Sequence, residues 1–265
     1  MRGLVRGAAG AVLAALMAAP ALAQTGLPAP KPWAEPSKDP RDLNGVYMPE
    51  SNSYSYLPVE GGDPPWTPEA KADFLRRRQA DKDGKPIVNT STLCLPSGMP
   101  KVMTAPYPIE VVTQPKQVII LHEIQHLMRF IYLGEQHPTG DDLFPTYAGH
   151  SVGHWEGDVL VVDTVATTGG LTTLDQSDRP KSGAMHIVEH LRKIEGGKKL
   201  EDLVTFDDPK VYTKPWTARL LYDWRPDIRF IEYICEENNR NKPDASGKLR
   251  HGDGGRYATR DQAKK

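Results

Sequence analysis

The chain has 265 residues, two cysteines and a formal net charge of −1, from 33 Lys and Arg against 34 Asp and Glu. No basic excess is present to indicate nucleic-acid binding. A single cysteine pair also argues against a zinc site with thiolate ligands.

The first 23 residues have the pattern of a secretory signal peptide. Arg2 and Arg6 give a basic start, residues 7–20 are apolar, and Ala21-Leu-Ala23 resembles a cleavage site. A retained membrane anchor is the alternative, and no later stretch is long and apolar enough to span a bilayer. We therefore expect a periplasmic or secreted protein. In an oxidising compartment Cys94 and Cys235 most simply form one disulfide, with two free buried thiols as the alternative.

The residues after the signal form a leader and then one helix. Residues 24–41 contain five prolines, which predicts an extended leader. Residues 42–47 read as a first strand. Residues 67–82 are the one good helix candidate, because Thr67 is a suitable N-cap and Pro68 occupies the first helical position.

From Pro108 onward, short β-rich runs alternate with turn residues. Single strands are expected at 109–112, 118–122 and 127–133, and three hairpins follow, at 151–155 with 159–164, 185–194 with 200–206, and 216–224 with 228–236. Consecutive hairpins predict an antiparallel meander. Eight to ten twisted strands avoid exposed edges by closing, so we predict an all-β protein with a lipocalin-like barrel over 42–240. A two-sheet β-sandwich is the alternative, and 241–265 is predicted to be a polar, disordered tail.

Six of the eight histidines form three H-x-x-x-H pairs, one of which is His150 with His154. On a strand, residues four apart share a face but lie about 13 Å from each other, so one pair cannot chelate one ion. A divalent metal would instead need one histidine from each of several strands, such as His122, His150 and His186. We predict no other cofactor.

Asp163 is the preferred partner of His150. It shares a strand face with Val159, Val161 and Val165, which predicts that this face looks inward, and a buried carboxylate needs a partner. The flanking Gly149 and Gly153 would let backbone or ligand approach His150 closely. The alternative is that these histidines are surface or structural residues.

Other polar and aromatic residues are secondary candidates. Glu123 and Arg129 are expected to form a buried pair or to position a substrate, and Glu236 is a carboxylate held rigidly beside Cys235. Tyr212 and Trp216 would line an apolar pocket or belong to the core. The motifs of serine hydrolases, zincins and nucleotide-binding proteins are not found in the sequence.

Four motifs stand out along the chain: GHSVG at 149–153, WEGD with LVVDT at 155–164, DPKVYTKPW at 208–216 and EYICEENN at 232–239. Together they resemble a widespread set of exported bacterial proteins with a GHSxGxWEGDxLVVDT motif. The resemblance covers roughly residues 90 to 240 and implies export. It implies no activity, substrate or catalytic residue.

Three functional hypotheses follow. The first is a cofactor-independent lyase, isomerase or hydrolase acting on a small organic molecule, with His150 as base, Asp163 as its orienting partner and His186 or Glu236 as acid. The second is a lipocalin-like carrier of an apolar ligand. The third is a metal-binding protein that uses the three-strand histidine set. The sequence predicts no nucleic-acid partner and indicates no oligomeric state.

Overall fold

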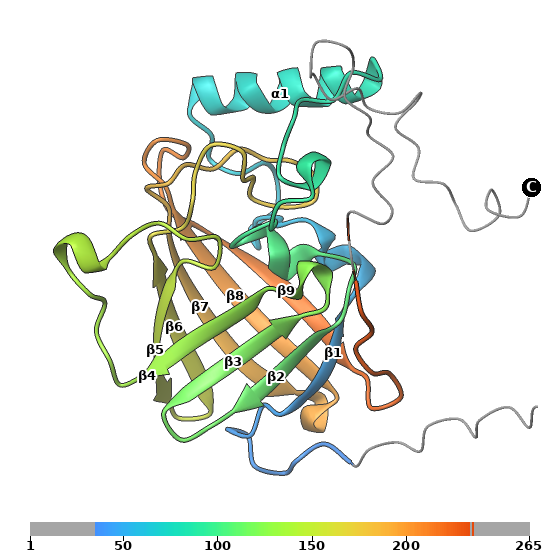
Figure 1. Ribbon diagram of the computed structural model, residues 1–265, viewed down its shortest axis with the longest axis vertical. Helices are drawn as coiled ribbons and strands as arrows, with labels where there is room; N and C mark the ends of the chain where they lie inside the picture. The colour runs from blue at the N-terminus through green and yellow to red at the C-terminus, as the bar shows by residue number, and fades with distance from the viewer. Residues whose placement is uncertain (1–34, 234, 236–265) are drawn as a thin grey trace, which may run out of the picture.

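The computed structural model describes residues 35–233 and residue 235, and within them the β-strands form one closed barrel (Figure 1). The strands are β1 (Gly45–Pro49), β2 (Ile109–Thr113), β3 (Gln117–His122), β4 (Met128–Leu133), β5 (His150–Glu156), β6 (Val159–Val165), β7 (His186–Ile194), β8 (Lys199–Asp207) and β9 (Trp216–Trp224). Short 3-10 helices are η1 (Ser51–Tyr54), η2 (Ser91–Leu93), η3 (Lys101–Thr104), η4 (Ile124–His126), η5 (Gly140–Asp142) and η6 (Glu195–Gly197). The predicted all-β, lipocalin-like barrel is therefore confirmed.

Neighbours in the barrel follow the order of the chain, and β1 pairs with β9 to close it. Every pair is antiparallel except β4 with β5, which run parallel. Parallel neighbours need a long connection, and residues 134–149 provide it as a loop at the side of the barrel (Figure 1). The prediction of a simple antiparallel meander is wrong at this one pair.

Two of the three predicted hairpins are present, as β5 with β6 and β7 with β8. The third is wrong, because residues 225–233 contain no strand. Strand β9 already pairs with β8 on one side and with β1 on the other, so it has no free edge for a further partner. The single strands expected before the hairpins, and the first strand, are present.

The predicted helix is α1 (Pro68–Lys82), and the Thr67 hydroxyl accepts a hydrogen bond from the Ala70 amide at 3.2 Å. It lies beyond the loops that cover one end of the barrel, called here the upper end (Figure 1). Ala70 is its one buried residue. Arg76 and Arg78 are exposed, whereas Arg77, which pairs with Asp73 on the same helix, is only 16% exposed.

The upper end of the barrel is plugged by the segment that contains η3. The Tyr56 hydroxyl donates to the Pro100 carbonyl at 3.1 Å, and the Tyr222 hydroxyl donates to the Met103 carbonyl at 2.8 Å. Met99 and Met103 are buried beside these contacts. The upper opening is therefore filled by the protein's own chain.

The barrel interior also contains a polar centre. Arg129 on β4 forms a two-armed ion pair with Glu189 on β7, and it donates to the hydroxyls of Ser151 and Thr164 at 3.1 and 2.8 Å. Burial, and next the negative charge of Glu189, raise the pKa of Asp202 well above its usual value, which favours the neutral form of this carboxyl group. The buried charge of Arg129 is thus paired with that of Glu189 inside the barrel.

A disulfide joins Cys94 to Cys235, as predicted, with Cα atoms 5.5 Å apart and a sequence separation of 141 residues. It ties the segment that follows β9 to the loop that precedes η3. This bridge fits folding in an oxidising compartment. Among the described residues, no helix has the length and apolar character needed to cross a membrane.

Candidate functional site

The histidine and carboxylate candidates meet on the outer wall of the barrel, over β5, β6 and β7. Along β6 the buried residues are Leu160, Val162 and Thr164, so these face the interior. Asp163 therefore points outward, with 41% of its side chain exposed. The prediction that Asp163 faces inward is wrong, because β6 is apolar on both faces and its valine-rich side is the outer one.

A histidine that was not predicted as a site residue connects this cluster. His137, from the loop between β4 and β5, places its Nε2 3.0 Å from Asp163 Oδ1 and its Nδ1 2.8 Å from His150 Nδ1. His186 Nε2 lies 2.9 Å from the same Asp163 oxygen. His150 and Asp163 are thus linked through His137, with no direct hydrogen bond between the two in the described residues.

The Asp163 carboxylate, at one end of this series of hydrogen bonds, determines which ring nitrogens carry the protons. An ionised Asp163 can only accept, so the Nε2 groups of His137 and His186 donate to it. In neutral His137 the Nδ1 then accepts from the Nδ1–H of His150. A neutral His150 is left with a lone pair on Nε2, which is the form that a general base requires.

The surroundings of His150 favour that neutral form. Burial lowers the pKa of His150 below its usual value, and the positive charge that His137 can carry lowers it further, while Glu135 opposes the shift. The ring is half-buried and stacks on Tyr132 of β4, with centroids 5.5 Å apart and planes 24° apart. The packing therefore holds the ring in one orientation.

His137 was not predicted as a site residue because it lies in a loop outside the three H-x-x-x-H pairs. Its place depends on the path of residues 134–149, which the parallel pairing of β4 and β5 sets. The neighbouring Pro138 is the one local signal that this loop has a restricted backbone.

The two glycines beside His150 serve packing of the barrel wall, and not the approach of a ligand. Gly149 has a φ of +70°, and a Cβ there would lie 2.8 Å from the Val165 carbonyl oxygen. A Cβ on Gly153 would lie 2.9 Å from a methyl group of Ile131. Of the two predicted possibilities, backbone or ligand, it is the backbone of β6 that lies close to these glycines.

Glu123 and Arg129 do not pair. Arg129 is fully buried against Glu189 inside the barrel, and the Glu123 carboxylate accepts a hydrogen bond from the Ile231 amide at 3.0 Å. The prediction of a Glu123–Arg129 pair is wrong because Arg129 reaches across the interior from β4 to β7. Neither residue reaches the histidine cluster.

The three-strand metal set is not brought together either. His122 lies inside the barrel, 1% exposed, whereas His150 and His186 lie on the outer wall. Within the part of the chain that the structure describes, no group of three or more His, Cys, Asp or Glu side chains is arranged to hold a metal ion. The predicted metal-ligand set of His122, His150 and His186 is therefore wrong, because His122 faces the interior and the other two face outward.

The remaining candidates belong elsewhere. Tyr212 and Trp216 are buried, with ring centroids 5.4 Å apart, and pack in the core near the upper end. Glu236 lies outside the described residues. His154 is exposed on the outer wall beyond the cluster and contacts Glu156 at 3.0 Å.

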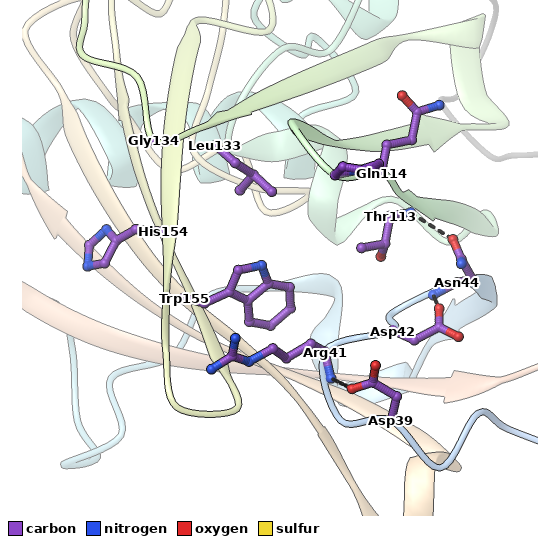
Figure 2. Close-up of a pocket in the computed structure, with 11 residues that line it drawn as sticks. Asp39, Arg41, Asp42, Asn44, Thr113, Gln114, Leu133, Gly134, His154 and Trp155 are labelled. Atoms are coloured by element: carbon purple, nitrogen blue, oxygen red, sulfur yellow. Dashed lines mark hydrogen bonds between the residues drawn. The ribbon is translucent and has the colours of Figure 1, made fainter.

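A separate cleft of about 670 Å³ opens at the lower end of the barrel (Figure 2). Thr113, Leu133 and Trp155 follow the inward-facing register of β2, β4 and β5, so they line the lower mouth. The segment from Asp39 to Asn44 forms the opposite lip. This cleft and the outer histidine cluster share no residue.

Comparison with protein-family models, with curated proteins and with solved structures found no match for this chain. The resemblance to exported bacterial proteins stays a prediction from the sequence motifs.

Proposed function

We propose that the protein is an exported β-barrel enzyme that performs acid–base chemistry on a small organic molecule at the outer wall of the barrel. The observation that carries this proposal is the hydrogen-bonded chain from Asp163 through His137 to His150. Lyase, isomerase and hydrolase reactions are the classes that such a chain serves without a redox cofactor.

In this proposal His150 is the general base. When its Nε2 takes a proton from the substrate, the Nδ1 proton can pass to His137, whose Nε2–H already donates to Asp163. The new positive charge then lies beside the carboxylate, where the opposite charge stabilises it. Compared with an isolated surface histidine, His150 is kept neutral and oriented, and the charge that it takes up can move to the carboxylate.

His186 is the proposed general acid. Its Nε2 shares the Asp163 oxygen with His137, and 41% of its side chain is exposed. The Nδ1 of a protonated His186 can donate to a leaving group or to a carbanion. Asp163 is a positioning residue here, because it acts through the two rings that it holds.

The same geometry gives less support to the other two hypotheses. A carrier of lipocalin type needs room inside its barrel, and here the interior holds the Arg129–Glu189 pair while the η3 segment fills the upper opening. The histidines proposed as metal ligands are divided between the two sides of the wall. The N-terminal sequence and the disulfide support the exported location that the proposal includes.

Two generic reactions test the site without knowledge of the natural substrate. We would measure hydrolysis of a panel of esters and lactones, and exchange of acidic C–H groups of small carbonyl compounds in D₂O by NMR. His150→Gln is expected to lower the rate of any reaction found by about 10²–10⁴-fold, the range typical of general acid–base catalysis. His137→Gln is expected to lower it by less, because it removes the relay and leaves the base.

His154→Gln is the matched control, because His154 lies on the same strand and the same outer face but contacts only Glu156. It should leave the rate unchanged. The rate should also rise with pH through a midpoint below 6.5, since the pKa of His150 is lowered. Equal rates for wild type, His150→Gln and His154→Gln would show that the hydrogen bonds from Asp163 through His137 to His150 are only structural.

A further inference from the structure

The lower mouth of the barrel has the properties of a second binding site, independent of the acid–base proposal. Figure 2 shows the indole of Trp155 in the middle of the cleft, with Leu133 and Thr113 on one side and Arg41 beneath it. These side chains come from separate parts of the fold. The barrel strands therefore supply one wall, and the segment that leads into β1 supplies the other.

The indole is held in a defined position. The Arg41 guanidinium lies over the Trp155 ring, 5.9 Å from its centroid, and Arg41 Nε donates to the Gly157 carbonyl at 2.8 Å. A cation over a ring face is attracted by the electrons of that face. Trp155 also packs against the buried core, so it is a rigid surface.

The rim of the cleft is polar but electrically balanced. Asp39 and Asp42 bring two negative charges. Arg41 brings one positive charge to the rim. Lys193 does not line the cleft, but its positive Nζ donates to the carbonyls of Asp39 and Asp42 at 2.6 and 2.9 Å. Such a rim does not select a strongly charged ligand, and it is too polar for a lipid chain.

The rim offers both donors and acceptors. Asp42 accepts from the Asn44 amide at 3.1 Å, and Asn44 in turn accepts from the Thr113 amide at 2.7 Å, so these groups are fixed before any ligand binds. The side-chain amide of Gln114 adds a further donor and acceptor. Hydroxyl groups, which both donate and accept, match this arrangement best.

We infer that the cleft binds a neutral sugar ring. One face of such a ring carries C–H groups, which pack on the electron-rich face of an indole, while its edge carries hydroxyls. The part of the Trp155 indole that lines the cleft and is not covered by Arg41, together with Leu133, supplies the apolar surface. Asp42, Asn44 and Gln114 supply the hydrogen bonds. The ligand class is a neutral mono- or oligosaccharide.

Saturation-transfer NMR on the full chain tests this inference with three neutral trisaccharides, maltotriose, cellotriose and chitotriose, and with p-cresol as an aromatic probe. At least one trisaccharide at about 10 mM should receive saturation, as expected for a dissociation constant near the millimolar range. Trp155→Ala should weaken that binding by about tenfold or more, the loss typical of an anchoring aromatic residue.

Two further variants keep the result interpretable. Asp42→Asn removes a charge at the rim and keeps the acceptor for the Asn44 amide, so the fold is preserved and binding should weaken by a few-fold. Phe144→Ala removes an aromatic ring that is 65% exposed elsewhere on the surface, and binding should not change. The inference is overturned if no trisaccharide is saturated, if Trp155→Ala and Asp42→Asn both bind as wild type does, or if only p-cresol depends on Trp155.

Discussion

His122 points into the barrel, is 1% exposed, and has no hydrogen-bond partner for either ring nitrogen within the described residues. Burial lowers its pKa to about 3, and the positive charge of Arg129 contributes to the shift. In the unfolded chain the pKa of a histidine is about 6.5. The unfolded chain therefore binds a proton below pH 6.5, whereas the folded protein does not bind it until about pH 3.

This difference makes the fold less stable as the pH falls from 6.5 towards 3. Each pH unit in that window is worth about 1.4 kcal/mol for one proton. At pH 5, His122 should therefore lower the free energy of unfolding by about 2 kcal/mol relative to its value at pH 8. The loss should not grow further below about pH 3, where the folded state also binds the proton.

His122→Leu isolates this contribution, because the titrations of all other groups are then common to the two proteins. Urea unfolding followed by circular dichroism at pH 8, 6 and 5 would give both stability curves. We expect the difference between variant and wild type to increase by about 2 kcal/mol between pH 8 and pH 5 in favour of the variant. A difference that stays constant with pH would refute the assignment of His122 as a buried neutral base.

Three further perturbations have defined outcomes. Glu189→Ala leaves the Arg129 charge buried without its partner and should lower the free energy of unfolding in urea by about 3–5 kcal/mol; a loss below about 1 kcal/mol would contradict the burial of that pair. Cys94→Ser removes a disulfide with a sequence separation of 141 and should lower the free energy of unfolding by about 4–5 kcal/mol on the chain-entropy model. A reducing agent should lower the melting temperature of wild type and leave that of the variant unchanged. Gly149→Ala should lower stability by about 1–3 kcal/mol through its positive φ and its contact with the Val165 carbonyl; an unchanged melting curve would show that the wall relaxes freely there.

Local patterns in the sequence were sufficient to predict most of the fold. Hairpin turns such as Glu156-Gly-Asp158 and the helix start at Thr67 are determined by residues close together in the chain. The closed barrel follows because many consecutive twisted strands leave no favourable open edge. These features need no knowledge of contacts between distant residues.

The site was predicted only in part, because its contacts are distant in sequence. The strand that contains Asp163 is apolar on both faces, so its periodicity cannot show which face looks inward. Arg129 and Glu189 lie on β4 and β7, which are not neighbours in the barrel, and only the closed wall brings them together. His137 depends in the same way on the course of one loop.

The barrel is closed by pairing of β1 with β9, in which Tyr47 lies opposite Trp224. The two strands that close it therefore come from opposite ends of the described chain. Contacts between residues so far apart form slowly, because a large loop must be closed before they contribute any stability. Until β9 became available, a chain emerging residue by residue would leave one edge of β1 and one edge of the last strand formed unpaired. We therefore expect refolding on the timescale of milliseconds to seconds. We also expect that the chain needs protection from aggregation until the whole of β9, up to residue 224, is available for pairing.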